Sequence, residues 1–241
     1  MKIIQDIELV DLAIYFKSNL VISDIHIGYE EALNKQGVLV PRVQFDDIIR
    51  RMEKIFLELN DKNIEKIIIN GDLKHEFGAI SEQEWRNTLK FLDLLAKRCN
   101  EIILIKGNHD NILGPIAKKR NIKIAENVIL GGVLIAHGDK LPQKELLNKI
   151  STIIIGHEHP AISLKESSKT ETYKCFLKGK YKGKNLIVQP SFNPLAEGAN
   201  ILRDKLLSPF LKQGLDNFKV YIVEDKIYDF GRLGKLKRKM N

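Results

Sequence analysis

The sequence has few cysteines and no long hydrophobic run. Among its 241 residues only Cys99 and Cys175 are cysteines, and they do not form a CxxC pair. Two such thiols argue against a disulfide scaffold, a thiolate metal site or a redox motif, and we expect both in the core. No apolar run approaches the roughly 18 residues of a membrane helix, and the early acidic residues Asp6 and Glu8 do not fit a secretory leader. We therefore expect a soluble, cytoplasmic protein with no membrane partner.

Several catalytic signatures are also missing. The chain has no Gly-x-Ser-x-Gly elbow and no reactive-cysteine motif, so nothing indicates a nucleophilic side chain. The absence of a Gly-rich Walker-type loop argues against a nucleotide-driven motor. No repeat or low-complexity linker divides the chain. We expect residues 1–241 to form one domain, with a short basic tail over about 231–241.

The charge balance is basic, with 39 Lys and Arg against 31 Asp and Glu, a formal net charge of +8. This excess suits a polyanionic partner such as nucleic acid. Basic residues gather at 118–120, 178–184 and 235–239. Charge-rich composition is also general in heat-adapted organisms, so a plain solvated surface is the competing interpretation of these segments.

Five short apolar runs indicate buried strands. They are Leu20–Ser23, Ile67–Asn70, Ile102–Ile105, Val133–Ala136 and Thr152–Ile155. Continuous runs of this length, rich in β-branched residues and closed by Gly, Asn or Asp, are typical of strands buried on both faces. Each run is followed by an Asp, Asn or His motif, so these motifs are expected where strands end and loops begin.

Other segments predict helices and hairpins. Apolar residues at a 3.6-residue spacing predict a helix from Pro41 to Leu59. A second helix is expected to begin at Ser81, with Glu84 completing a capping box. Hairpins are predicted around residues 178–184 and 224–225, and the first 23 residues read as two short strands leading into a third. The pattern favours an α/β (α+β) fold with a mixed sheet or pair of sheets and outer helices.

All six histidines lie inside, or three residues from, five short polar motifs. In chain order these are Asp24-Ile25-His26, Gly71-Asp72 with His75, Gly107-Asn108-His109-Asp110, His137-Gly138-Asp139 and Gly156-His157-Glu158-His159. Neutral imidazole and carboxylate are ligands for divalent manganese, iron, cobalt and zinc. One such motif occurs often by chance, but five that each follow a strand-like run indicate a metalloenzyme.

Individual ligand positions follow from spacing and chemistry. Asp24 and His26 are two residues apart, so at an extended strand end both side chains point to one face and can bind one cation. The carboxylate of Asp72 has two oxygens and can bridge two cations roughly 3.5 to 4 Å apart. Asn108 offers a neutral amide oxygen, which keeps the negative charge of the site low enough to accept a phosphate.

His109 is interpreted as a group that does not bind metal. It can protonate a leaving oxygen or bind a phosphate oxygen, with Asp110 as a candidate to orient its ring. Asp110 fits equally well as the N-cap of a helix from Asn111 onward, and both roles are compatible.

The order and flanking glycines of these motifs resemble the calcineurin-like metallophosphoesterase superfamily: D-x-H, G-D, G-N-H-[DE], a lone H and G-H-x-H, from Asp24 to His159. The resemblance implies two packed mixed β-sheets flanked by helices. It also implies two divalent metals, commonly manganese, with iron, zinc, cobalt or nickel as substitutes, bridged by Asp72 and a water or hydroxide. The first metal would take Asp24, His26 and His159, and the second Asn108, His137 and His157. His109 would be the catalytic acid or transition-state stabiliser.

Residues 23–30, 71–75 and 190–195 are similar to archaeal and bacterial phosphoesterases related to the double-strand-break-repair nuclease, including the DNA-ligase-associated group. The capping and helical domains of that nuclease have no counterpart here. His75 matches a histidine that lies near the metals in that group, and is expected to contact a ligand or substrate, or else to be an ordinary surface histidine. The segment 191–198 is either a loop that closes over substrate or a plain surface loop.

We therefore expect a phosphate-ester hydrolase with two divalent metals, acting on phosphodiester bonds by a metal-activated water, with DNA or RNA as a possible substrate. The alternatives are a phosphomonoesterase or nucleotide hydrolase and, from another class, a phosphoesterase fold that survives as a binding scaffold.

Overall fold

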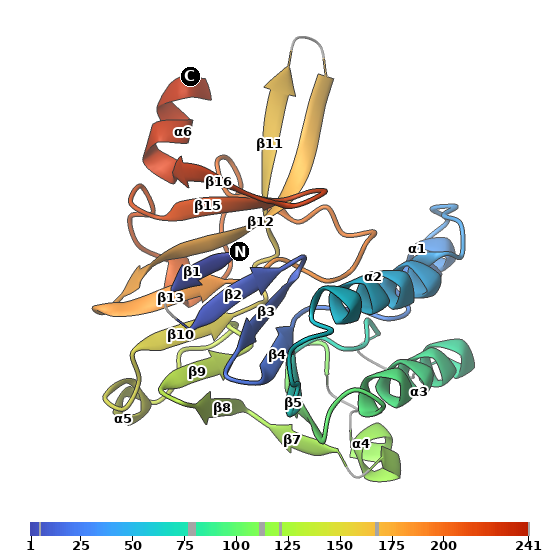
Figure 1. Cartoon of the computed structure of the whole chain (residues 1–241). Helices are drawn as coiled ribbons and strands as arrows, with labels where there is room; N and C mark the ends of the chain where they lie inside the picture. Colours follow the sequence, from blue (N-terminus) through green and yellow to red (C-terminus); the bar gives the residue numbers. More distant parts are fainter. Residues whose placement is uncertain (5, 77–80, 111–113, 121, 167–168, 241) are drawn as a thin grey trace.

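The structure is a computed structural model that describes residues 1–4, 6–76, 81–110, 114–120, 122–166 and 169–240. Within them it forms two mixed sheets flanked by helices (Figure 1). The helices are α1 Tyr29–Lys35, α2 Gln44–Glu58, α3 Glu82–Ala96, α4 Gly114–Arg120, α5 Lys144–Leu147 and α6 Leu233–Met240, with a 3₁₀ turn at Pro209–Leu211.

The first sheet contains the amino-terminal strands in the order β1-β2-β3-β4-β5-β6-β7. Their bounds are β1 Lys2–Ile4, β2 Ile7–Val10, β3 Ala13–Phe16, β4 Asn19–Ile22, β5 Lys66–Asn70, β6 Glu101–Ile105 and β7 Lys123–Ala125. Strands β1 to β4 pair antiparallel, whereas β4, β5, β6 and β7 pair in parallel. The carboxyl ends of β4, β5 and β6 therefore meet at one edge.

The second sheet follows the order β14-β11-β12-β13-β10-β9-β8, and β15 joins it through β12. Its strands are β8 Asn127–Leu130, β9 Val133–Ala136, β10 Thr152–Ile155, β11 Pro160–Glu166, β12 Lys169–Tyr181, β13 Lys184–Val188, β14 Ala199–Asn200, β15 Lys219–Val223 and β16 Ile227–Arg232. Strands β9, β10 and β13 are parallel neighbours. A second set of parallel carboxyl ends is thereby formed.

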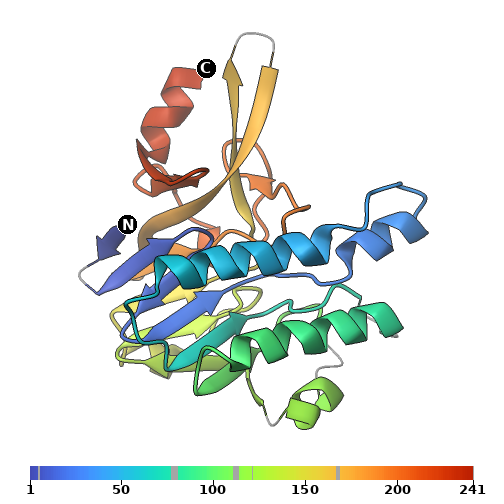
Figure 2. The same cartoon turned by 45° about the vertical axis from the view of Figure 1, so that its right-hand side comes forward.

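Alternation along the strands of the second sheet shows how the layers pack. Ile154 belongs to the core shared with the first sheet, whereas Ile153 and Ile155 belong to a second core on the other face. This two-residue period is what a strand between two apolar layers requires. Helices α2 and α3 lie along the outer face of the first sheet (Figures 1 and 2).

The five predicted strands are confirmed as β4, β5, β6, β9 and β10. The prediction for the first 23 residues was wrong in number, because four strands form there. The turn between β3 and β4 lies at Lys17 and Ser18, with φ of 44° and 61°. Two positive φ values form a tight hairpin turn that usually carries Asn-Gly, so the sequence signal was absent.

Both predicted helices form, with corrected starts and caps. The first begins at Gln44 rather than at Pro41. Ser81 caps α3 by accepting a hydrogen bond from the Glu84 backbone N–H at 3.1 Å. The Glu84 side chain does not return this bond as a capping box predicts. Its Oε1 instead accepts from the backbone N–H groups of His75 and Glu76.

The hairpin around residues 178–184 has a much shorter turn than predicted, because β12 continues to Tyr181 and β13 starts at Lys184. The second hairpin forms as β15 and β16.

The segment expected as a basic tail, about 231–241, contains the end of β16 and helix α6. Gly231 and Arg232 end β16, and α6 follows, with Leu233 buried in the second core; residue 241 lies outside the described residues. Cys175 is buried and Cys99 half-buried. In the part of the chain that the structure describes, no helix is both long and apolar enough to cross a membrane.

Candidate metal centre

The predicted ligands converge where the two sets of parallel strand ends meet. The first sheet contributes Asp24, His26, Asp72 and Asn108 from the loops after β4, β5 and β6, and the second contributes His137, His157 and His159 from the loops after β9 and β10. Residues 135 positions apart in sequence are thus neighbours in space.

One group of donors surrounds His159. Its Nε2 lies 3.3 Å from Oδ1 of Asp24 and 3.4 Å from Nε2 of His26. The ligand atoms of these three residues all lie within 4.8 Å of one another. This is the set that the family resemblance implies for the first metal.

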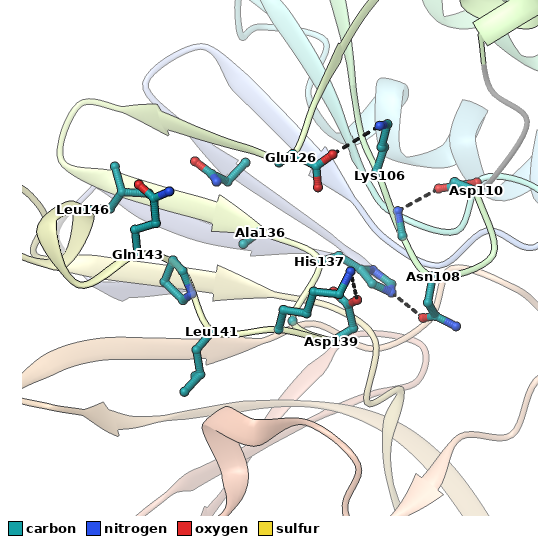
Figure 3. A pocket seen from close by; sticks show the side chains of 15 residues that line it. Lys106, Asn108, Asp110, Glu126, Ala136, His137, Asp139, Leu141, Gln143 and Leu146 are labelled. Carbon is teal, nitrogen blue, oxygen red and sulfur yellow. Dashed lines mark hydrogen bonds and ion pairs between the residues drawn. The ribbon is translucent and has the colours of Figure 1, made fainter.

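A second group surrounds His137. Its Nε2 lies 3.0 Å from Oδ1 of Asn108 (Figure 3), and its ring centroid is 4.9 Å from that of His157. Oδ2 of Asp72 lies between the two groups, 3.7 Å from Nε2 of His26 and 3.5 Å from Nε2 of His137. A carboxylate in this position can contact an ion in either group.

The protonation preferences of these residues fit divalent cations. Burial, followed by the nearby carboxylates of Asp24 and Asp110, raises the pKa of Asp72 to about 9. Burial acts to raise the pKa of Asp24 as well, but the surrounding histidines, His159 foremost, hold it below its usual value. Two buried carboxylates this close do not both ionise without added positive charge, which cations supply.

The imidazoles fit the same conclusion. Burial lowers the pKa of His26 well below its usual value and that of His157 to about 4. Both rings are therefore neutral at neutral pH, the form that binds metal. The mixed nitrogen and oxygen donors suit manganese, iron, cobalt, nickel or zinc.

The ligand loops hold an unusual backbone conformation. Asp24, His26, Asp72, His157 and His159 have φ of 55°, 49°, 50°, 66° and 48°. The left-handed region costs a residue with a side chain of order 1 kcal/mol or more, and such residues cluster at functional sites. Here the conformation turns the chain sharply at each strand end.

Two glycines allow the close approach of the loops. A Cβ added at Gly107 would overlap Oδ1 of Asp72, and one added at Gly71 would overlap the ring of His137. The glycines of the G-D and G-N-H-[DE] motifs are therefore steric requirements of the donor cluster.

Comparison with known proteins agrees with this geometry. The calcineurin-like phosphoesterase family matches residues 19–214, more than half of the chain. The chain belongs to this family. Members of the family typically bind two divalent metals, and membership supports a hydrolase as the class of this protein. Among curated proteins none matches.

One solved structure shares the fold of the chain, and others are less similar to it. The nuclease MPE of Pseudomonas putida is 20% identical, with a TM-score of 0.64 over 92% of this chain and 93% of that one. A Vps29 variant from Entamoeba histolytica is 18% identical over 88% and 99% of the chains with a TM-score of 0.36. The phosphopantetheinyl hydrolase of Mycobacterium tuberculosis is 12% identical over 81% and 98%, also with a TM-score of 0.36.

The segment 191–198, for which the sequence allowed two interpretations, supports the phosphoesterase site. Oγ of Ser191 donates to the carbonyl of Asp24 at 2.7 Å, and the N–H of Phe192 donates to the carbonyl of Ser23 at 2.8 Å. Ser191, Phe192 and Asn193 are buried. This half of segment 191–198 is therefore a fixed support behind Asp24 rather than a surface loop.

The sequence suggested Asp110 as the residue that orients the ring of His109, but in the structure a backbone carbonyl does so. Its Nδ1 lies 2.7 Å from the carbonyl of His75, whereas Oδ2 of Asp110 accepts from the N–H of Gly107 at 3.0 Å. Asp110 thus stabilises the loop rather than the ring. Asp110 was also a candidate N-cap for a helix from Asn111 onward, but residues 111–113 lie outside the described residues.

His75 lies next to the predicted ligand His26, and the Nδ1 atoms of the two rings are 3.4 Å apart. Burial lowers its pKa to about 4. Its ring stacks on that of His109 with centroids 5.3 Å apart. It borders a 500 Å³ cavity over the first donor group, which His26, His109, His157 and His159 also line.

Two supporting residues were missed in the sequence. The side chain of Lys74 is fully buried, and its ammonium donates to the carbonyls of Glu76 and His109. The Glu84 carboxylate holds the N–H groups of His75 and Glu76 from α3. In the sequence, a Lys next to a G-D motif looks like an ordinary surface residue. The position of Glu84 indicated only a role in capping its own helix.

Proposed function

We propose that the protein is a phosphodiesterase that depends on two divalent metal ions, with manganese the first choice. The observation that carries the proposal is the position of Oδ2 of Asp72, 3.7 Å from His26 and 3.5 Å from His137, between two groups of donors. When bound, two cations orient the phosphate, activate a water and offset the charge that develops as it attacks.

The first ion would be held by Asp24, His26 and His159 and the second by Asn108, His137 and His157, with Asp72 shared. Since these residues come from both sheets, we also propose that residues 1–241 act as one catalytic domain.

His109 would protonate the leaving oxygen. Its Nδ1 donates to the carbonyl of His75, so Nε2 is the ring atom that gains or loses a proton. Burial lowers the pKa of His109, so a nearby anionic phosphate is needed to favour the protonated ring. Hydrolysis forms one bond from water oxygen to phosphorus and breaks the bond from phosphorus to the leaving oxygen, which takes the proton from His109. The attacking water gives up one proton to solvent, and His109 regains one from solvent.

Nucleic acid is a candidate substrate because the chain carries a net charge of +8 and shares its fold with the nuclease MPE of Pseudomonas putida. The alternative, a phosphomonoesterase or nucleotide hydrolase, is separated from a diesterase by substrate choice. A non-catalytic scaffold is the least favoured alternative, since all seven predicted ligands are present and converge.

The test is turnover of bis-p-nitrophenyl phosphate and p-nitrophenyl phosphate with Mn²⁺. We expect preference for the diester, and a loss of at least about 100-fold in Asp72→Asn, since this change removes the shared charge while keeping the shape of the side chain. Asp46→Asn, an exposed residue of α2, is the matched control. Preference for the monoester would favour the alternative, and equal rates for wild type and Asp72→Asn would exclude a metal-dependent mechanism at this site.

The role of His109 as a general acid is tested with two diesters that differ in their leaving group. A p-nitrophenolate leaving group departs readily without a proton, whereas phenolate benefits from one. We therefore expect His109→Ala to slow a phenyl diester by about 10²- to 10⁴-fold and a p-nitrophenyl diester by much less. An equal loss on both esters would exclude general acid catalysis by His109.

A further inference from the structure

A second cavity adjoins the donor cluster on the side of His137 and Asn108. Its volume is 670 Å³, within the range of ligand-binding pockets. It is bordered by the loop after β9, by α5, and by the segment that follows β6 (Figure 3). The cavity over His26 and His109 also includes Asn108 in its lining. The donor cluster therefore has a cavity on each of two sides.

This arrangement bears on the number of organic groups on the phosphate. A phosphate held between the two donor groups has one ester substituent if it is a monoester and two if it is a diester. The leaving oxygen of either ester belongs on the side of His109. Only a diester has a second group to place in the cavity beside His137.

The lining of the His137-side cavity combines apolar side chains with charged and amide groups. Leu141, Pro142 and Leu146 supply the apolar surface, and Asn127 and Gln143 supply amides. Leu141 is 48% exposed although its side chain is large and hydrophobic. Apolar side chains next to hydrogen-bonding groups suit a nucleoside, whose ring has an apolar face and a polar edge.

Both lysines that line the cavity lie beside a carboxylate. Nζ of Lys106 lies 3.2 Å from Oε1 of Glu126 (Figure 3), and Nζ of Lys140 lies 3.6 Å from Oδ2 of Asp139. The Lys charges at the cavity are thus offset locally. A neutral ring suits this lining better than a second anionic phosphate does.

We propose that this cavity is the subsite for the ester group that stays on the phosphate, and that the group is a nucleoside-sized aromatic heterocycle. The inference rests on the proposed function. In the reaction the bond from phosphorus to the group in this cavity is kept, and the bond to the group on the His109 side is broken.

The experiment compares thymidine 5′-(p-nitrophenyl phosphate) with methyl p-nitrophenyl phosphate in the presence of Mn²⁺. Both esters release p-nitrophenolate, so they differ only in the group that stays. We expect wild type to favour the thymidine ester in kcat/KM. In Leu141→Asp the ratio between the two esters should fall about tenfold or more, because a charged carboxylate replaces apolar contact with the ring. The control is Leu57→Asp on α2, an exposed leucine distant in sequence from the cavity lining, which should keep the wild-type ratio.

A wild-type ratio near one, or a ratio that Leu141→Asp leaves unchanged, would overturn the subsite while leaving the proposed function standing. If wild type hydrolyses neither ester, the proposed function fails, and the cavity is then judged by binding. Thymidine 5′-monophosphate should bind the Mn²⁺-loaded protein more tightly than methyl phosphate, with the difference lost in Leu141→Asp. Equal binding of the two phosphates by wild type would overturn the inference.

Discussion

The buried ammonium of Lys74 donates a 2.8 Å hydrogen bond to the backbone carbonyl of His109. The same ammonium bonds the carbonyl of Glu76, and the ring of His109 in turn bonds the carbonyl of His75. A cation held below the surface thus connects the segment after β5 to the segment after β6. These contacts fix where the His109 ring stands relative to the metal ligands.

We expect Lys74→Met to lower kcat by about 10- to 100-fold, the range seen when a partner of a metal-site residue is removed. Two half-buried carbonyls lose their donor, which costs up to about 1–3 kcal/mol each and lowers Tm as well. The informative measurement is the leaving-group dependence of kcat. If Lys74 positions His109, Lys74→Met becomes as sensitive to the leaving group as His109→Ala, and the double variant loses nothing further.

Lys90→Met, an exposed lysine of α3, is the control for the loss of a positive charge. A multiplicative loss in the double variant would show that Lys74 acts independently of His109.

Gly107→Ala should abolish metal-dependent turnover and also lower Tm. Its backbone φ is not in the left-handed region, so the added methyl group acts by overlap with Oδ1 and the backbone nitrogen of Asp72 and not through strain in its own backbone. Metal affinity, measured by titration calorimetry with Mn²⁺, is the direct check. Gly214→Ala is the matched control, since a Cβ there has no atom within 4 Å among the described residues. Wild-type affinity in Gly107→Ala would contradict the close packing of this loop against Asp72.

Mn²⁺ should raise Tm and a chelator should lower it again. A ligand that binds only the folded protein adds about 2.7 kcal/mol at 100 times its Kd, on the order of 5–10 °C for a chain of this length. His159→Ala removes a donor from the first group and should shift the response to higher Mn²⁺ concentration. Calorimetric scans of both proteins with and without Mn²⁺ test this, and an identical concentration dependence would argue against His159 as a ligand.

Lys174 provides a pH dependence away from the ligands themselves. Its ammonium donates to the carbonyls of Ser191 and Asn193, and burial, followed by repulsion from Arg51, lowers its pKa to about 7. The unfolded chain, with an ordinary pKa near 10.4, binds more protons above pH 7 than the folded protein does, so this residue makes folding more favourable as pH rises.

The measured quantity is the free energy of unfolding of wild type minus that of Lys174→Met. We expect the difference to grow between pH 7 and 9 by up to about 1.4 kcal/mol per pH unit. Using the difference cancels groups that titrate in both proteins. A difference that shrinks with rising pH would show that the buried ammonium is not disfavoured in the folded protein.

The strands and the donor cluster were predictable from sequence because their signals are local. Apolar runs such as Ile67–Asn70 need no partner to be recognised, and the polar residue after each run marks the strand end. Parallel pairing then brings those ends together, which is why Asp24 and Asp72 became neighbours as expected.

The supporting contacts were not predictable, because they depend on residues brought together by the fold. Glu84 satisfied a local capping pattern, yet its carboxylate serves the backbone of His75 and Glu76. Likewise, nothing within a few residues of Lys74 signals that its ammonium is buried. Leu233 is a further example near the end of the chain. The basic segment around it gave no sign that its side chain would be buried in the second core.

The contacts that hold Asp24 in place come from residues far along the chain. Asp24 accepts hydrogen bonds from the N–H of His157, 133 residues further along the chain. Ser191, later still, holds the carbonyl of Asp24. Contacts over such separations form late, since the intervening chain must first be ordered. The donor cluster is therefore complete only when both sheets have packed together. During refolding, the onset of metal binding would mark the last step of folding rather than the first.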